Sequence, residues 1–418
     1  GGAVGGRLNA ARRIVVTGIG AVTPVGTGRR ELWEALLAGR SGFSAVESFD
    51  THAHPVHRGA EVKGFRPEAH VKRLDPSGLG RASQLAIAAA WLALEDAGID
   101  PGDPMDVDPE TAGVAMGTTS GEPREVEALD DLLLAGETDR VGPEFVHLYP
   151  CHVLASHVAA EIGFEGPNTV IPTACAAGNY AIAHAMDLLS AGRAELMLAG
   201  GADAFSRITY TGFSRLGAIA PEVCQPFDRN RKGMIPGEGA AMVVLEPLDR
   251  ARARGARIYA EVAGYGLSCD AHHMTAAHPD GSGAARAMER ALRESGLTAA
   301  DVSYVSAHGT GTPTNDRLES IAVKRVFGAR SRQVPISSIK SMLGHTMGAA
   351  SAIEAAVCSL AVHEDRIPPT MNLLEPDPEC DLDCVPNVAR EITVKVAMNN
   401  AYAFGGNNAS VIFKKCAG

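Results

Sequence analysis

The sequence is poor in the features that mark extracellular, membrane-spanning or nucleic-acid-binding proteins. Its 8 cysteines in 418 residues are too sparse for a disulfide scaffold, and none of them form a Cys-x-x-Cys pair. No apolar run reaches the ~18 residues of a membrane span. A net charge of −11 argues against the basic field that nucleic-acid binders carry. We therefore expect a cytoplasmic protein with no nucleic-acid or membrane partner.

Aromatic residues are also scarce, at 5% of the chain, whereas glycine is abundant with 46 residues. Small residues let helices and strands approach closely. The hydrophobic share of 45% and the charged share of 21% fit a globular protein with a large core. These numbers predict a tightly layered α/β body. The glycine-rich start, residues 1–11, is expected to be a flexible tail.

Helix-like and strand-like segments alternate along the chain. Apolar periodicity and glycine stops predict helices over 29–39, 81–97, 151–162, 175–191, 282–295, 314–327 and 347–363. Short apolar runs predict strands over 13–17, 111–116, 195–199, 240–245, 258–265, 302–306, 334–337, 391–399 and 409–413. This alternation favours helices packed on largely parallel sheets.

Two halves are expected, 12–265 and 266–416, with a linker-like break over 268–279. Each half ends in a glycine-rich turn followed by an apolar strand. This similarity between the two halves is a weak indication of internal duplication.

Cys175 lies between a strand-like run and a predicted helix, in Pro172-Thr173-Ala174-Cys175-Ala176-Ala177-Gly178. The partial positive charge at a helix N-terminus favours the thiolate over the thiol. The small neighbours leave room for a substrate to reach the sulfur. The alternative is a buried structural cysteine, which is the usual place of a free cysteine.

Two histidine motifs follow Cys175 along the chain. His308 comes directly after a predicted strand, and the nearby hydroxyls of Thr310 and Thr312 could hold a phosphorylated arm or a substrate amide. His345 lies in a loop between a strand and a helix, five residues after Lys340. A cysteine with two such histidines is the layout of a thiolate nucleophile with imidazole helpers. The alternatives are a turn whose histidine bonds to backbone, and a surface lysine beside a helix-start histidine.

The fourth motif is the segment Asn400-Ala401-Tyr402-Ala403-Phe404-Gly405-Gly406-Asn407-Asn408, a glycine turn between two predicted strands. Glycines on one side of Phe404 permit close backbone approach to a ligand and let the phenyl ring swing. The alternative is a hairpin turn with a core phenylalanine.

In this order and spacing the four motifs resemble those of the β-ketoacyl synthases, condensing enzymes of the thiolase superfamily. The resemblance spans nearly the whole chain and includes Val15-Val16-Thr17-Gly18-Ile19-Gly20, Pro226-Phe227-Asp228-Arg229 and Gly237-Glu238-Gly239. It implies the α/β thiolase fold, with two duplicated βαβαβαββ halves in a five-layered α-β-α-β-α body. The Cys-His-His set is similar to that of the elongating kind from fatty-acid and type II polyketide systems. The initiating kind pairs its cysteine with His and Asn.

The resemblance also implies a reaction. An acyl chain passes from an acyl carrier protein to Cys175 as a thioester, a malonyl-carrier loses CO₂, and its carbanion attacks that thioester. The implied catalytic residues are Cys175, His308, His345 and Lys340. No metal and no cofactor are implied, because the phosphopantetheine arm belongs to the carrier.

Further roles follow from the same resemblance. The backbone N–H groups of Cys175 and Phe404 would form the oxyanion hole, with Phe404, followed by Gly405, as a gate. Thr310 and Thr312 would bind the phosphopantetheine arm. The supporting residues would be Glu354 and Asp316.

The implied partners are an acyl carrier protein and a second subunit, in a homodimer or in a heterodimer with a chain-length-factor-like chain. Carrier proteins of this kind are acidic, so docking on this acidic chain needs a local basic patch. Our candidates for that patch are Lys63, Arg66, Lys72, Arg73 and Arg81. The alternative is an ordinary solvated loop and helix face.

Two departures from the family pattern bear on the substrate. The glycine turn ends in Asn407-Asn408, where relatives usually have Thr-Asn, and the segment 118–127 is unlike the common fatty-acid enzyme. Both favour a specialised polyketide role over fatty-acid synthesis.

Three alternative functions stay open. They are a chain-length-factor-like subunit, although such subunits lack the cysteine; an acyltransferase or decarboxylase on the same fold; and a thiolase. A degradative thiolase needs a second cysteine near the C-terminal glycine turn, and Cys416 lies too far beyond Gly406.

Overall fold

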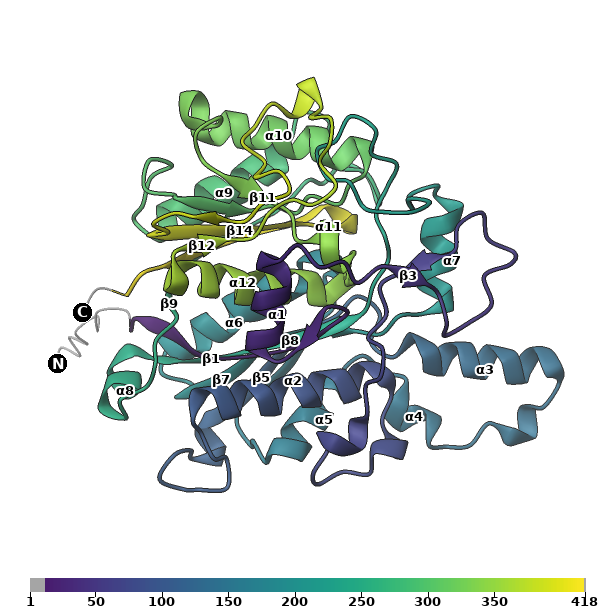
Figure 1. Ribbon diagram of the computed structural model, residues 1–418. Coiled ribbons are helices and arrows are strands. Elements are labelled where there is room, and N and C mark those ends of the chain that lie inside the picture. Colours follow the sequence, from purple (N-terminus) through teal and green to yellow (C-terminus); the bar gives the residue numbers. More distant parts are fainter. Residues whose placement is uncertain (1–11, 417–418) are drawn as a thin grey trace, which may run out of the picture.

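The computed structural model describes residues 12–416, and an 11-stranded mixed sheet forms its centre (Figure 1). The predicted tail, 1–11, lies outside the described residues. The main strands of the first half are β1 (Ile14–Thr23), β5 (Ala112–Gly117), β6 (Asn168–Ile171), β7 (Leu196–Asp203) and β8 (Gly239–Pro247). Those of the second half are β9 (Ala260–Cys269), β10 (Tyr304–Ser306), β11 (Ile336–Ser337), β14 (Val396–Tyr402) and β15 (Asn407–Lys414).

The two halves repeat one topology, which confirms the expected duplication. The sheet order is β11-β10-β14-β15-β9 and then β1-β8-β7-β5-β6. Numbered along the chain, the five strands of each half therefore lie in the order 3-2-4-5-1 from the outer edge inward. In both halves the first three strands of this order pair in parallel, and the remaining pairs are antiparallel.

The expectation of largely parallel sheets is wrong. The short turn between β14 and β15 can only return the chain antiparallel. The halves also join edge to edge, because Ile14–Val16 of β1 pairs antiparallel with Ala260–Val262 of β9. β9 thus occupies in the second repeat the place that β1 has in the first.

Helices complete five layers, visible edge-on in Figure 1. The outer layers contain α2 (Arg81–Ala97) and α5 (Val153–Ile162) on one side, and α9 (Ser282–Glu294) and α10 (Pro313–Phe327) on the other. The central layer contains α6 (Ala177–Ser190) and α12 (Ala350–Glu364), which pack against each other and against both sheet halves. Every residue from Ala350 to Val362 is buried, and apart from Glu354 these residues are apolar or small, as expected of a helix covered on all faces. The five-layered thiolase fold is confirmed.

Several segments differ from the sequence-based boundaries. β1 is ten residues long because its glycines continue the strand beyond residue 17, and close packing against α2 requires them: a Cβ at Gly18 or Gly20 would meet helix backbone at 2.2 Å and 2.0 Å. The strand expected over 391–399 begins later, as β14 at Val396, with the short β13 (Arg390–Glu391) before it, and β15 begins two residues earlier than expected, at Asn407. The remaining short elements are β2 (Gly26–Thr27), α1 (Arg29–Leu37), β3 (Ser44–Ala45), β4 (Arg58–Gly59), α8 (Leu248–Ala253), α11 (Lys340–Leu343) and β12 (Arg366–Ile367).

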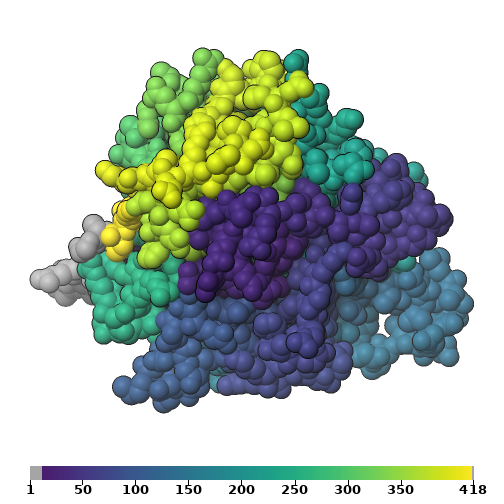
Figure 2. Space-filling view, in the orientation of Figure 1, coloured from purple at the N-terminus to yellow at the C-terminus, as the bar shows by residue number. Residues whose placement is uncertain are grey.

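A side lobe that the sequence did not predict projects from the body at the lower right of Figures 1 and 2. It contains α3 (Pro123–Ala135) and α4 (Phe145–Leu148), and α3 contacts α7 (Arg207–Arg215). The lobe and α7 expose apolar side chains, among them Leu133, Leu134, Val146, Tyr149 and Ile208. Among the helices of residues 12–416, none combines the length and apolarity needed to cross a membrane.

Candidate active site

Cys175 lies on a sharp turn between β6 and α6. Ala174, just before it, has a φ of +50°, a left-handed conformation that is uncommon for a residue with a Cβ. A single 3₁₀ turn over Ala174–Ala176 then leads into the helix. The side chain is 8% exposed and faces a cavity.

The predicted thiol and both predicted imidazoles meet in this cavity, although they come from different halves of the chain. His345 Nε2 lies 3.1 Å from Cys175 Sγ. The rings of His308 and His345 are 5.6 Å apart between centroids and nearly perpendicular, at 85°. The sulfur and one ring nitrogen of each histidine lie within 4.8 Å of one another. The same three atoms could hold a thiophilic metal ion such as Zn²⁺, which would block the thiol.

The hydrogen bonds of His345 assign its tautomer. The backbone N–H of Met347 donates to Nδ1 at 3.2 Å, so the ring proton of the neutral form belongs on Nε2, facing the sulfur. Burial, aided by the charge of Lys340, holds the pKa of His345 well below 6.5. His345 is therefore a neutral hydrogen-bond donor toward Cys175.

His308 follows β10 on a loop that rests on two buried carboxylates of α10. The backbone N–H groups of His308 and Gly309 each donate to Glu319 at 2.8 Å. Asp316 accepts from the N–H of Gly311 at 3.2 Å, so this expected supporting residue holds the threonine-bearing part of the loop. Sequence reasoning missed Glu319. Its position three residues after Asp316, on the same helix face, was the available signal.

Lys340 and Glu354 form a buried ion pair, each side chain being 1% exposed. The lysine is therefore not a surface residue, and Glu354 is its partner as expected. Burial raises the pKa of Glu354 to about 7. The charge of Lys340 lowers the pKa of Cys175 and of both histidines.

The protonation state of Cys175 corrects one expectation. Burial raises the pKa of its thiol to about 12, more than the opposing charge of Lys340 lowers it. Loss of hydration raises the thiol pKa more than the helix N-terminus and the charge of Lys340 lower it, so the resting group is a thiol.

The cavity has a volume of about 240 Å³, and the expected arm-binding and gate residues line it. The hydroxyls of Thr310 and Thr312 are 2.8 Å apart on its wall, and Thr312 also caps the N-terminus of α10. Phe404 is 39% exposed at the cavity mouth, with its ring 5.7 Å from that of Phe213. Gly405 turns the chain beside it with a φ of +81°.

The five basic residues expected to dock a carrier differ in their availability at the surface. Arg81 is engaged inside the protein, where it donates to Glu238 at 2.8 Å and to the carbonyl of Val62 at 2.9 Å. It is therefore not a free surface charge, which corrects that expectation. The other four residues are exposed: Lys63, Arg66, Lys72 and Arg73.

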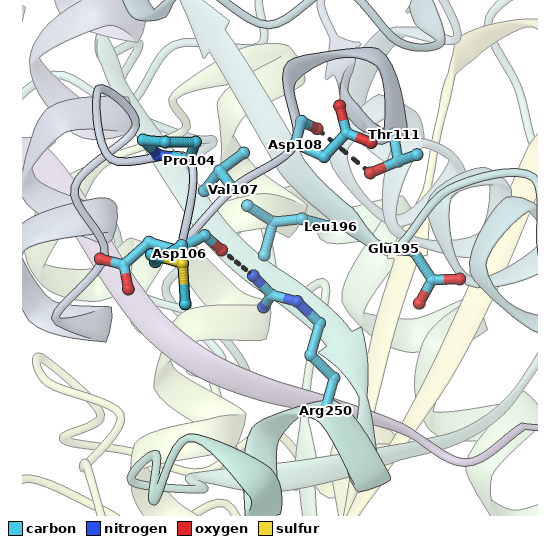
Figure 3. A pocket seen from close by; sticks show the side chains of 9 residues that line it. Pro104, Asp106, Val107, Asp108, Thr111, Glu195, Leu196 and Arg250 are labelled. Carbon is cyan, nitrogen blue, oxygen red and sulfur yellow. Dashed lines mark hydrogen bonds between the residues drawn. The ribbon is translucent and has the colours of Figure 1, made fainter.

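A second cavity, of about 330 Å³, lies away from this site between the loop 104–111 and α8 (Figure 3). Arg250 crosses it to donate to the backbone carbonyl of Asp106. The wall of this cavity offers no thiol or imidazole among the described residues. It carries none of the expected chemistry.

Models of two protein-family domains match the chain. The β-ketoacyl synthase N-terminal domain matches residues 11–251, and the β-ketoacyl synthase C-terminal domain matches residues 259–374. Together with the thiolase fold and the Cys-His-His site, these matches define a condensing enzyme. The chain belongs to the β-ketoacyl synthase family.

Individual relatives agree with this assignment. The chain is 39% identical to 3-oxoacyl-[acyl-carrier-protein] synthase 2 of Synechocystis sp., over 97% of this chain and 98% of that one. Among solved structures, the ishigamide ketosynthase/chain length factor is 42% identical, with a TM-score of 0.94 over 98% of this chain and 100% of the other. A type II polyketide ketosynthase, solved with its acyl-carrier protein and bound to the hexaketide, is 32% identical, with a TM-score of 0.89 over 98% and 100%. The chain is accordingly a ketosynthase, an enzyme of the acyltransferase class.

Proposed function

We propose that this ketosynthase extends an acyl chain held on Cys175 by decarboxylative condensation with a malonyl-carrier, in polyketide rather than fatty-acid biosynthesis. The observation that carries the proposal is that one thiol sulfur and one ring nitrogen of each of two neutral imidazoles lie within 4.8 Å of one another in one cavity. The likeness to a type II polyketide ketosynthase supports the polyketide setting.

The first stage is transfer of the acyl chain. The Cys175 sulfur attacks the thioester carbonyl of the acyl-carrier, the bond from carbon to the carrier sulfur breaks, and the leaving sulfur takes the cysteine proton. The Nε2–H of His345 would stabilise negative charge on Cys175 Sγ. The backbone N–H groups of Cys175 and Phe404 would receive the oxyanion.

The second stage is condensation. The bond between the malonyl carboxylate and its α-carbon breaks, CO₂ leaves, and the electron pair moves to the thioester oxygen as an enolate. His308 and His345 would donate hydrogen bonds to that oxygen, each worth roughly 2.7–4 kcal/mol. The α-carbon then attacks the thioester on Cys175, which releases the thiolate and a β-ketoacyl-carrier two carbons longer.

The Lys340–Glu354 pair would set the electrostatics of this stage. The lysine charge disfavours protonation of both histidines, so they stay neutral donors. Thr310 and Thr312 would bind the phosphopantetheine arm where it enters the cavity. No cofactor or metal ion is needed in this scheme.

An acyl carrier protein is the proposed partner, as in the solved polyketide relative that was captured with its carrier. Lys63, Arg66, Lys72 and Arg73 are the proposed docking charges. We further propose a dimer, either of two copies or with a chain-length-factor-like chain, and the apolar side chains of the lobe and α7 are available for it.

The test is product analysis with the purified protein and carriers loaded with saturated or β-keto chains plus malonyl-carrier. Mass spectrometry is expected to find a carrier-bound product two carbons longer, with β-keto primers preferred. CO₂ release without chain extension would contradict condensation. Preference for long saturated primers would contradict the polyketide setting.

A further inference from the structure

One polar group of the cavity has no role in the scheme above. Tyr402 ends β14 and is 8% exposed. Its ring lies edge to face with that of His308, with centroids 5.7 Å apart and planes at 67°. It lines the same cavity as Cys175 and both histidines.

The hydroxyl of Tyr402 is buried without a hydrogen-bond partner among residues 12–416. Leaving a buried hydroxyl unpaired costs about 1–3 kcal/mol, so native proteins rarely keep one without a use. Several neighbouring polar groups on the cavity wall are engaged: Thr310 and Thr312 bond to each other, and the amide of Asn408 donates to Asp270. Nδ1 of His308, beside Tyr402, is also buried without a partner among residues 12–416. A ligand that enters the cavity can supply the acceptor for the Tyr402 hydroxyl.

We propose that Tyr402 is a substrate-contacting residue whose hydroxyl donates a hydrogen bond to the free carboxylate of the malonyl unit. This inference rests on the proposed function. If the thioester oxygen lies on the two imidazoles, the carboxylate, two bonds from the thioester carbon, must lie beside them. Tyr402, in contact with His308, is the donor at that position.

The electrostatics support a donor role. Burial and the nearby charges of Glu319 and Asp270 raise the pKa of Tyr402 well above 10. The phenol therefore stays protonated at every working pH, and a hydrogen bond to an ionised acceptor is stronger than one to a neutral group. Because the carboxylate loses its charge as CO₂ forms, this bond strengthens substrate binding rather than the transition state.

Tyr402→Phe removes the hydroxyl alone, and CO₂ release from malonyl-pantetheine reads out its effect. KM is expected to rise about tenfold, the value of one hydrogen bond to a charged group, while kcat does not fall. Acylation of Cys175 by hexanoyl-pantetheine, which has no free carboxylate, is expected to keep its wild-type rate. Tyr265→Phe is the matched control, because its hydroxyl bonds to Asp187 at 2.7 Å and does not line the cavity.

An unchanged KM for malonyl-pantetheine would overturn the inference. So would equal losses in acylation and CO₂ release, which indicate a structural role, or a fall in kcat at constant KM, which indicates a donor to the enolate. A wild-type protein that releases no CO₂ would instead overturn the proposed function, and this inference with it.

Discussion

The two halves of the molecule build the same turn and use it differently. In the first half, Ala174 with a φ of +50° precedes Cys175 and α6; in the second, Met347 with a φ of +54° precedes Gly348 and α12. The two turns contact each other at the centre of the protein. Cys175 faces an open cavity, whereas the N–H of Gly348 donates to the carboxylate of Asp203 at 2.5 Å.

The same contrast holds at the ends of two corresponding strands. β7 ends at Asp203, which Ala204 and Phe205 follow, and β14 ends at Tyr402, which Ala403 and Phe404 follow. Asp203 accepts hydrogen bonds from Thr118 and Gly348 and closes the second helix terminus, while Tyr402 faces the substrate cavity. Duplication therefore supplied two helix N-termini, one of which places the Cys175 thiol in the cavity, while the other is joined to Asp203 by a hydrogen bond.

The largest effect is expected at Cys175, on the turn that faces the cavity. Cys175→Ala removes the only group that can hold the acyl chain, so chain extension should fall at least about 10³-fold. Malonyl decarboxylation should partly persist, because both imidazoles stay in place. Product and CO₂ are measured in parallel; normal condensation by this variant would refute the nucleophile assignment.

Substitution of the two histidines is expected to impair decarboxylation, whereas substitution at the corresponding strand end of the first half is expected to impair only stability. His308→Ala and His345→Ala should each lower CO₂ release by about 10²–10³-fold, the cost of losing one oxyanion donor. Thr118→Ala, at the corresponding strand end of the first half, should lower thermal stability and leave the rate of CO₂ release nearly unchanged. Unchanged CO₂ release in both histidine variants would remove the enolate role.

The corresponding phenylalanines should behave oppositely. Phe205 is 2% exposed and stacks on Phe49 with ring centroids 5.7 Å apart, so Phe205→Ala should destabilise folding by about 3–5 kcal/mol. Phe404 is 39% exposed, so Phe404→Ala should cost far less stability and change the order in which acyl and malonyl substrates enter. Urea unfolding and pre-steady-state acylation distinguish the two; equal destabilisation would mean that Phe404 is a core residue.

The smallest effects are expected at the buried ion pair. Lys340→Met removes a charge that lowers the pKa of Cys175, so alkylation by iodoacetamide at pH 7 should slow. Glu354→Gln removes a charge that raises this pKa, so alkylation should speed up. In the wild type, a thiol pKa of about 12 means that alkylation rises about tenfold per pH unit from pH 7 to 9 without levelling. Shifts of the same sign in both variants would contradict this electrostatic account.

Much of the site could be predicted from the sequence because its chemistry is local. Cys175, His308 and His345 each lie in a short turn with a recognisable pattern of small residues, and Lys340 is close to His345 in the chain. Glu319 escaped because its spacing from Asp316 indicates only a shared helix face, and does not identify the loop that folds against that face.

Three further features could not be predicted, each for a physical reason. The thiol pKa depends on how completely folding removes water from Cys175, which a helix-terminus argument does not include. The edge pairing of β1 with β9 depends on the relative placement of two halves, whereas strand periodicity reports only burial within each half. Arg81, read as a surface charge, is engaged by Glu238, a residue 157 positions away.

The most direct test of the account is peptide mapping of the acylated protein. After brief incubation with an acyl-carrier, the peptide that contains Cys175 should gain the mass of the acyl group and lose it again when malonyl-carrier is added. An acyl group found on another residue, or a Cys175 adduct that malonyl-carrier never discharges, would contradict the central claim.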